Sequence, residues 1–279
     1  MAAMDAGTGR PATLAMRAVS YRYPGYARQV LQELDLEIGP GEIVGLVGAN
    51  EAGKSTLCLV AAGLAPASIG GTLGGEVAVD GRTTAGRATH DLAASVGLVF
   101  QDPNTQRSGV TATVFEEVAL GSVNLGRSVA ETVWRTRAAL ATLRIEALAD
   151  RDPARLSGGQ AQLVAVASIL AMGPRLLVLD EPTAQLDPQG TRLVGEALRV
   201  LAGTGTALLI AEHKTDLLDG LCSRIVGLHA GRIAFDGAAA AILEDPALVA
   251  IGVEAPARVR LARAAAERGL TLPADALVS

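Results

Sequence analysis

Residues 48–56 read GANEAGKST, and this short stretch decides the fold. The apolar run before it, residues 42–47 (EIVGLV), predicts a buried strand, and the residues after it predict a helix from about residue 53 to residue 63. A strand, a loop of the pattern G-x-x-x-x-G-K-S and a helix form the context in which such a loop binds phosphate. Its glycines let successive backbone N–H groups point at phosphate oxygens, and the helix N-terminus adds positive charge. The stretch therefore predicts a nucleotide-binding site.

Two side chains of this phosphate loop predict ATP together with Mg²⁺. We expect the Lys54 ammonium to reach the β- and γ-phosphates and the Ser55 hydroxyl to bind the magnesium ion. Composition favours this role for Lys54, because the 24 basic residues are 22 arginines and only two lysines, and arginine cannot replace a compact ammonium at a close phosphate contact. The nucleotide-binding candidates of the loop are Gly48, Asn50, Glu51, Ala52, Gly53, Lys54, Ser55 and Thr56.

A second apolar run ends in two carboxylates. Residues 176–179 (LLVL) predict a buried strand, and Asp180 and Glu181 follow it directly. We expect Asp180 to help hold magnesium, and Glu181 to polarise the attacking water. Downstream of a phosphate loop in the same chain, this pattern indicates a phosphoryl-transfer site.

A third motif, residues 156–160 (LSGGQ), precedes a helical run to Met172. A serine and two glycines at the start of a helix form another anion-binding end. The motif resembles the signature of ABC ATPases, and the resemblance covers about residues 14–237. In that family, the signature of one subunit closes over the nucleotide held by the phosphate loop of another, so the two sites need not meet within one chain. The resemblance implies nucleotide contacts for Ser157, Gly158, Gly159 and Gln160.

Two further positions resemble catalytic positions of the family. Gln101, after the VGLVF strand, resembles the Q-loop glutamine, which senses magnesium and the attacking water and faces the transport subunit. His213, at the end of the TALLIAEH stretch, resembles the switch histidine that contacts the γ-phosphate. The resemblance thus implies catalytic roles for Glu181, His213 and Gln101, and metal contacts from Ser55, Gln101 and Asp180.

Two more positions complete the expected nucleotide site. Residues 184–187 (AQLD) resemble the family's D-loop and add Asp187 to the nucleotide contacts. Tyr23 resembles the aromatic residue that stacks on adenine, although Tyr21 and Tyr26 lie close enough in the chain to compete for that role.

The alternation of apolar strands and helices predicts an α/β fold with a largely parallel sheet. The resemblance implies a P-loop NTPase (RecA-like) core with an antiparallel β subdomain, an α-helical signature subdomain and a short C-terminal helical extension. We expect a disordered lead over residues 1–12, the ATPase domain over 13–237 and the extension over 238–279. Residues 70–75 are expected to form a turn. Trp134 is expected to pack in a helical core, with a partner-facing position as the alternative.

Three details resemble the energy-coupling-factor branch of ABC ATPases, whose importers take up vitamins and transition metals. They are residues 100–106 (FQDPNTQ), residues 113–121 (TVFEEVALG) and the tail from residue 252 (GVEAP) into an arginine-rich helix. This resemblance implies a pair of ATPases, as homodimer or heterodimer, on the cytoplasmic face of the membrane. It also implies a transmembrane coupling protein and a small membrane substrate-binding protein.

Two alternatives stay open, an ATPase of another ABC importer or exporter and an SMC-like DNA-repair ATPase. The second class needs a long coiled coil between phosphate loop and signature, but only about 100 residues separate Lys54 from Ser157, without sustained heptads. The net charge of −5 and the lack of a basic stripe also argue against nucleic acid as a partner. No stretch approaches the ~18 apolar residues that span a bilayer, so we expect any membrane role to come through partners.

Two positions depart from the family pattern. Glu51 stands where glycine is common, which places a carboxylate near the phosphates, and Leu163 stands where arginine is frequent. Neither change removes a catalytic group, so the departures concern loop conformation and local ion pairing.

Overall fold

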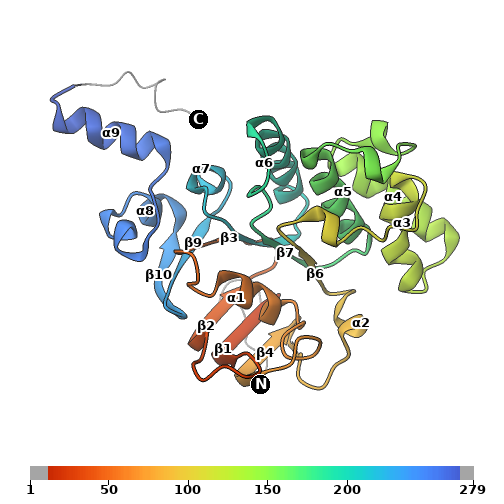
Figure 1. Cartoon of the computed structure of the whole chain (residues 1–279), viewed down its shortest axis with the longest axis horizontal. Helices are drawn as coiled ribbons and strands as arrows, with labels where there is room; N and C mark the ends of the chain where they lie inside the picture. The colour runs from red at the N-terminus through yellow and green to blue at the C-terminus, as the bar shows by residue number, and fades with distance from the viewer. Residues whose placement is uncertain (1–11, 271–279) are drawn as a thin grey trace.

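The computed structural model describes residues 12–270, and its centre is a six-stranded sheet (Figure 1). The strand order is β10-β9-β3-β8-β7-β6, with parallel pairing from β9 to β6 and an antiparallel hairpin of β9 with β10 at one edge. The strands are β3 (Ile43–Val47), β6 (Val96–Val99), β7 (Leu176–Asp180), β8 (Ala207–Ala211), β9 (Arg224–His229) and β10 (Arg232–Ala238). The α/β prediction is confirmed. The expected lead lies outside the described residues, except for Ala12.

The parallel strands are buried on both faces, which explains their unbroken apolar runs. Alternate residues of each strand enter different cores: Leu177 and Leu179 pack on the side of the signature helix, whereas Leu176 and Val178 pack on the side of the phosphate-loop helix. The second core also includes a four-stranded antiparallel sheet of order β2-β1-β4-β5. Its strands are β1 (Leu14–Arg22), β2 (Leu31–Ile38), β4 (Thr72–Val79) and β5 (Arg82–Thr83). The turn expected over residues 70–75 is therefore too long, because β4 already begins at Thr72.

Helices cover the parallel sheet on both sides (Figure 1). The α-helices are α1 (Lys54–Ala61), α2 (Thr89–Leu92), α3 (Val114–Asn124), α4 (Val129–Thr142), α5 (Gly158–Ala171), α6 (Pro188–Ala202), α7 (Thr215–Leu218), α8 (Ala239–Leu243) and α9 (Ala257–Glu267). Short 3₁₀ helices are η1 (Pro103–Thr105), η2 (Glu146–Leu148), η3 (Pro153–Arg155) and η4 (Pro246–Ile251). Among residues 12–270, no helix combines the length and apolarity required to cross a membrane.

Side-chain caps fix where the helices of the signature side begin. Thr113 and Ser157 each form a capping box with the residue three positions on, and Ser128 and Asp187 cap α4 and α6. Such caps satisfy N–H groups that the first turn of a helix leaves without a partner. The signature motif is thus a helix start whose geometry is set by its own residues.

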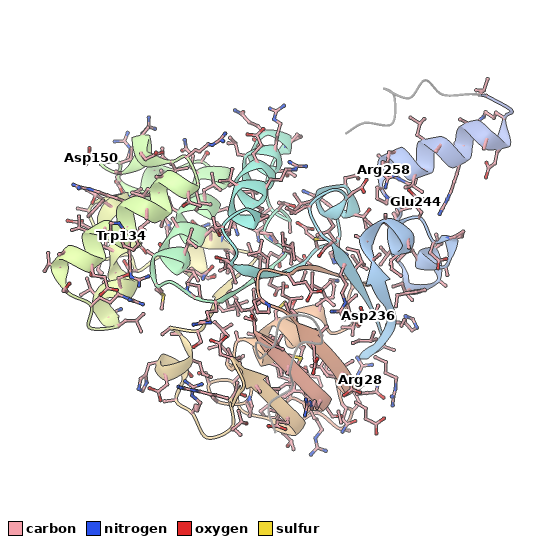
Figure 2. All side chains as sticks on the ribbon, turned by 180° about the vertical axis from the view of Figure 1, so that it is seen from behind. Arg28, Trp134, Asp150, Asp236, Glu244 and Arg258 are labelled. Atoms are coloured by element: carbon pink, nitrogen blue, oxygen red, sulfur yellow. The ribbon has the colours of Figure 1, made fainter. Side chains whose placement is uncertain are left out.

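The expectation that Trp134 packs in a helical core is wrong. Its side chain is 66% exposed on α4, and Figure 2 shows it at the surface of the helical subdomain. The buried face of α4 is formed instead by Thr132, Thr136, Ala139 and Leu140. These positions recur at helical spacing, and residue 134 falls on the opposite side of that face.

Candidate functional site

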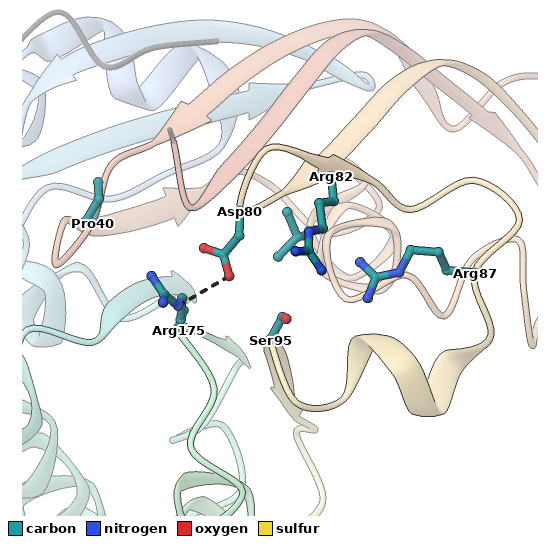
Figure 3. A pocket seen from close by; sticks show the side chains of 7 residues that line it. Pro40, Asp80, Arg82, Arg87, Ser95 and Arg175 are labelled. Atoms are coloured by element: carbon teal, nitrogen blue, oxygen red, sulfur yellow. Dashed lines mark ion pairs between the residues drawn. The ribbon is translucent and has the colours of Figure 1, made fainter. Parts of the chain in front are cut away.

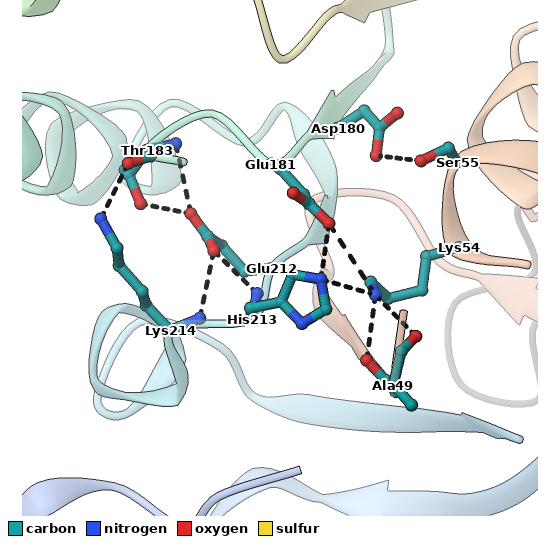
Figure 4. A network of polar contacts seen from close by, with 10 residues as sticks. Ala49, Lys54, Ser55, Asp180, Glu181, Thr183, Glu212, His213 and Lys214 are labelled. Atoms are coloured by element: carbon teal, nitrogen blue, oxygen red, sulfur yellow. Dashed lines mark hydrogen bonds and ion pairs between the residues drawn. The ribbon is translucent and has the colours of Figure 1, made fainter. Parts of the chain in front are cut away.

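Lys54, Glu181 and His213 converge at the carboxyl ends of three adjacent strands, β3, β7 and β8 (Figure 4), whereas Gln101, the third residue predicted for catalysis, follows β6. The phosphate loop follows β3, Asp180 ends β7, and His213 follows β8 by two residues. In parallel α/β sheets, ligands bind beyond the carboxyl ends of the strands. The topology therefore brings residues 54, 181 and 213 together although they lie far apart in sequence.

Lys54 is at the centre of this cluster and only 4% of its side chain is exposed. Its Nζ donates to the carbonyl oxygens of Gly48 at 2.9 Å and Ala49 at 3.1 Å, and it lies 3.8 Å from Glu181 Oε1. Burial lowers the pKa of Lys54, and the negative charges of Glu181 and Asp180 oppose that shift. The ammonium thus sits where its own loop and two carboxylates compensate its charge.

Glu181 and His213 are in direct contact. His213 Nε2 lies 2.8 Å from Glu181 Oε1 and 3.1 Å from Lys54 Nζ. Glu181 has a φ of 49°, a left-handed conformation that is uncommon for residues other than glycine and often marks functional sites. Its backbone N–H donates to the Ala211 carbonyl at 2.8 Å, so the end of β8 holds this turn in place.

Ser55 and Asp180 form a second polar pair beside the lysine. Ser55 Oγ donates to Asp180 Oδ1 at 3.1 Å, which places two protein oxygens side by side. Burial raises the pKa of Asp180, and the Ser55 hydrogen bond opposes the shift. Mg²⁺ at nucleotide sites is held by one or two protein oxygens together with phosphate oxygens and waters. The pair fits that donor set.

Glu51 departs from the family pattern without entering this cluster. Its φ is 62°, so it adopts the left-handed conformation that favours glycine. Its side chain is exposed and lines a shallow hollow of about 240 Å³ with Arg28, Gln32 and Ala230. Asn50 is also exposed, whereas Ala52, Gly53 and Thr56 of the loop are buried.

Of the three tyrosines, only Tyr23 is both half-buried and hydrogen-bonded to helix α1, which follows the phosphate loop. Its hydroxyl lies 3.1 Å from Thr56 Oγ1, and its ring meets Tyr21 edge-on with centroids 5.0 Å apart. Tyr21 is fully buried with its hydroxyl bonded to the Gly70 carbonyl, and Tyr26 is exposed. Tyr21 therefore presents no free face for a base.

Gln101 is exposed two residues beyond β6. Because Val99 pairs with Leu179, the chain at Gln101 leaves the sheet beside the end of β7. The loop that contains Gln101 is fixed where it leaves β6 by the side chain of Gln106. This side chain accepts a hydrogen bond from the Phe100 N–H at 2.8 Å and donates one to the Leu98 carbonyl at 2.9 Å. Gln106 thus extends the pairing at the edge strand and fixes where the loop starts.

The signature residues lie on a different surface from the catalytic cluster. Ser157, Gly158, Gly159 and Gln160 line a pocket of about 450 Å³ together with the D-loop residues Gln185, Leu186 and Asp187. Within the part of the chain that the structure describes, no hydrogen bond or ion pair joins the signature to the phosphate loop. One chain therefore presents two separate half-sites.

Leu163, the second departure, is buried on α5. It lines a mostly apolar pocket of about 230 Å³ with Leu143, Leu148 and Ala197. An apolar residue fits this position, since the neighbouring side chains offer it packing contacts.

The C-terminal extension reaches both the phosphate loop and the helix after His213. The Ala49 N–H donates to the Ile251 carbonyl at 3.1 Å, and Thr215 Oγ1 donates to the Glu254 carbonyl at 2.8 Å. Arg258 donates to both carboxylate oxygens of Asp219, at 2.5 and 3.0 Å. The chain beyond β10 is thus hydrogen-bonded to the phosphate loop and to helix α7, which follows His213.

Glu212 is a buried polar residue of this region that sequence reasoning missed. Only 1% of it is exposed, and it directly follows β8. The signal was available, because Glu212 ends the run ALLIA as Asp180 ends LLVL, and adjacent parallel strands end at the same edge. Lys214, the second of the two lysines, donates to the Thr183 carbonyl at 2.8 Å.

A larger hollow of about 790 Å³ lies at the opposite edge of the sheet (Figure 3). Its lining includes Ser95 and Arg175, which directly precede β6 and β7. Arg175 forms an ion pair with Asp80 at 3.5 Å, so part of its positive charge is already compensated. Its position before the strands separates this hollow from the catalytic cluster.

The chain is similar in sequence and in fold to known proteins. Residues 31–184 match the family model described as ABC transporter. The chain is 41% identical to the cobalt import ATP-binding protein CbiO of Rhodobacter capsulatus, over 86% of this chain and 83% of that protein. It is 39% identical to the energy-coupling factor transporter ATP-binding protein EcfA2 of Symbiobacterium thermophilum, over 94% and 91%. The solved structure of cbiO1 from Clostridium perfringens, described as part of the ABC transporter complex cbiONQ, superposes with a TM-score of 0.76 at 28% identity, covering 93% of this chain and 99% of that one.

Proposed function

Because this chain belongs to the ATP-binding subunits of ABC transporters, we propose that its ATP hydrolysis energises uptake through an energy-coupling-factor complex. Binding and hydrolysis of ATP follow from membership of the family. The proposal concerns the roles of single residues, the partners and the transported molecule. The observation that carries it is the contact of Lys54, Glu181 and His213 beside the Ser55–Asp180 pair.

In this proposal, each residue of the cluster has one task. Lys54 exchanges its carbonyl contacts for β- and γ-phosphate oxygens when ATP binds. Glu181 then accepts a proton from the attacking water, and His213 contacts the γ-phosphate. Ser55 and Asp180 hold Mg²⁺, which neutralises the charge that develops on the phosphates. Gln101 senses this site from the edge strand, and Tyr23 packs against the adenine.

A second ATPase subunit completes each site. The signature and the D-loop share one pocket, and among residues 12–270 neither forms a hydrogen bond or an ion pair with the phosphate loop. The N-terminus of α5 can bind phosphate through its backbone N–H groups. In a pair of ATPases, this end of one subunit closes over the nucleotide on its partner, with Ser157 and Asp187 at the junction.

The membrane partners are inferred from the relatives. One relative is named for cobalt import, another for an energy-coupling-factor transporter, and the structural neighbour is part of a complex. We infer that this chain sits peripherally on the cytoplasmic face, beneath a transmembrane coupling protein and a small membrane substrate-binding protein. The transported molecule is then a vitamin or a transition-metal ion.

The test is to isolate the assembly that this subunit forms. Tagged Glu181→Gln protein is purified from host membranes with ATP and magnesium, and the proteins that accompany it are identified by mass spectrometry. Recovery of a multi-span coupling protein with a small separate membrane protein supports the proposal. Recovery of a conventional permease would place the chain in another ABC importer or exporter, and recovery of no membrane protein would contradict a role in transport.

A further inference from the structure

Glu212 joins two segments of the site through a single buried carboxylate (Figure 4). Its Oε1 accepts from the backbone N–H of Thr183 at 3.2 Å and from the Thr183 hydroxyl. Its Oε2 accepts from the backbone N–H of His213 at 2.8 Å and of Lys214 at 3.1 Å. One carboxylate oxygen therefore accepts hydrogen bonds from the chain after β7, and the other accepts them from the chain after β8.

We propose that Glu212 is a positioning residue that holds His213 against Glu181 during ATP hydrolysis. The inference rests on the roles proposed above for Glu181 and His213. Glu181 lies two residues before Thr183, and His213 follows Glu212 directly. Both ends of the 2.8 Å contact between the catalytic carboxylate and the histidine are thus tied to the same carboxylate.

Glu212 is a buried acidic residue, with only 1% of it exposed. An ionised carboxylate inside a protein is costly unless hydrogen-bond donors surround it, and four donors meet Glu212. These donors fix its position, and the two chain segments are fixed with it. Lys214 adds a second tie, because its Nζ donates to the Thr183 carbonyl and, at 3.3 Å, to Thr191 Oγ1.

Hydrogen bonds that position His213 for catalysis can be distinguished by experiment from bonds that only stabilise the fold. Loss of a bond that only stabilises the fold would lower the free energy of unfolding and leave the turnover of folded protein unchanged. A bond that places His213 against Glu181 acts on the reacting geometry, in which a displacement of about 1 Å costs up to roughly a hundredfold in rate. Lys54, Ser55 and the backbone of the phosphate loop do not depend on Glu212 for any hydrogen bond in the described structure. ATP affinity should therefore be spared.

The test uses the purified full chain and compares four single variants and the double variant Glu212→Gln/Thr183→Val. Glu212→Gln keeps the shape but places an amide NH₂ against donors, and Thr183→Val removes the hydroxyl that Glu212 accepts. Thr183→Ser restores that hydroxyl. Thr136→Val is the matched control, because Thr136 is equally buried and its hydroxyl has no partner among the described residues.

We measure kcat and KM for ATP at a temperature well below each variant's unfolding transition, and binding of a fluorescent ATP analogue. Glu212→Gln and Thr183→Val should lower kcat about tenfold and change KM and nucleotide affinity by less than about twofold. Thr183→Ser should recover most of the rate, and the double variant should lose less than the product of the two single losses. Thr136→Val should keep the wild-type rate.

Two results would overturn the inference. One is a kcat within about twofold of wild type for both Glu212→Gln and Thr183→Val, which would assign the bonds to stability alone. The other is an equal loss in Thr136→Val and Thr183→Val. If Glu212→Gln does not fold, Thr183→Val decides the matter alone. Failure of the proposed roles would look different, since Glu181→Gln itself would then keep turning over.

Discussion

Asp180 and Glu181 are consecutive carboxylates in different surroundings. Asp180 ends β7 and accepts a hydrogen bond from Ser55, whereas Glu181 turns away in a left-handed conformation and meets His213 and Lys54. The change in backbone direction separates the carboxylate proposed to bind Mg²⁺ from the one proposed to accept a proton. Conservative substitutions at the two positions should therefore have different consequences.

Glu181→Gln should bind ATP, lose nearly all turnover and trap an ATP-bound dimer. The amide keeps the size of the side chain but cannot take a proton from water, and general-base catalysis contributes about 10²- to 10⁴-fold. Steady-state hydrolysis and light scattering after gel filtration with ATP and magnesium measure the two effects. A variant that still hydrolyses ATP near the wild-type rate would refute the role of Glu181.

Asp180→Asn should lose hydrolysis and yet raise the free energy of unfolding and the Tm at pH 7, because burial disfavours the ionised carboxylate and raises the pKa of Asp180. Because the folded pKa of Asp180 is raised above 3.8, the stability lost on ionisation builds up as the pH rises from 3.8 to the folded pKa and stays lost above it. The gain should therefore shrink as the pH falls and be gone below 3.8. Thermal unfolding at several pH values tests this, with the exposed Asp150→Asn as control. An unchanged or lower Tm for Asp180→Asn would contradict it.

At the scale of elements, α5 and α6 approach closely where two glycines meet. A Cβ added to Gly159 would lie 2.8 Å from Gly190 Cα, whereas one added to Gly158 would meet only the end of the Leu186 side chain at 3.3 Å. The close approach brings the signature and the D-loop cap into one pocket. The close approach to Gly190 is thus by itself a reason for glycine at the second glycine position of the signature.

Gly159→Ala should lower the free energy of unfolding by about 1–3 kcal/mol, because the new methyl group meets backbone that cannot yield. Gly158→Ala should be nearly neutral, since the Leu186 side chain can move and alanine favours the helix by up to about 1 kcal/mol. Urea unfolding compares the two. Equal effects at both positions would show that the Gly159–Gly190 contact tolerates a side chain.

Sequence predicted the elements with the simplest patterns. The strands β3, β6, β7 and β8 are short apolar runs buried on both faces, and the phosphate loop and signature carry their own turn and cap chemistry. Trp134 was misplaced because spacing alone did not reveal that Thr132 and Thr136 form the buried face of α4. Glu212 was missed although it ends the run ALLIA as Asp180 ends LLVL, because its contacts with Thr183 form only when the chain after β7 meets the chain after β8. The bond of Ala49 to Ile251 could not be foreseen because it joins residues 202 positions apart.

At the scale of the whole molecule, the C-terminal extension packs against the phosphate loop. Gly252 has a φ of 72°, and a Cβ there would lie 2.9 Å from Ala49 Cβ. Ala49 also donates its N–H to Ile251, and Arg258 binds Asp219 just after α7. The segment that leads into helix α9 therefore contacts the phosphate loop, and α9 itself, which projects from the body in Figure 1, is bonded to the chain just after α7.

Gly252→Ala should raise KM for ATP about threefold, because the added methyl group presses on the phosphate loop. Gly126→Ala is the matched control: its φ is also 72° and nothing lies within 4 Å of its added Cβ. Both variants carry a similar left-handed penalty of roughly 1–2 kcal/mol, so only the contact with Ala49 differs. Titration of the ATPase rate with ATP measures the shift, and equal KM values in the two variants would exclude transmission from the tail to the loop.

The separate surfaces of the signature and the phosphate loop have a genetic consequence if the subunit pairs with a copy of itself. A Lys54→Ala allele and a Ser157→Arg allele each inactivate both sites of their own homodimer. In a mixed pair, one site combines the two lesions, while the other joins an intact phosphate loop to an intact signature. Cells that carry both alleles should thus recover transport that neither allele supports alone.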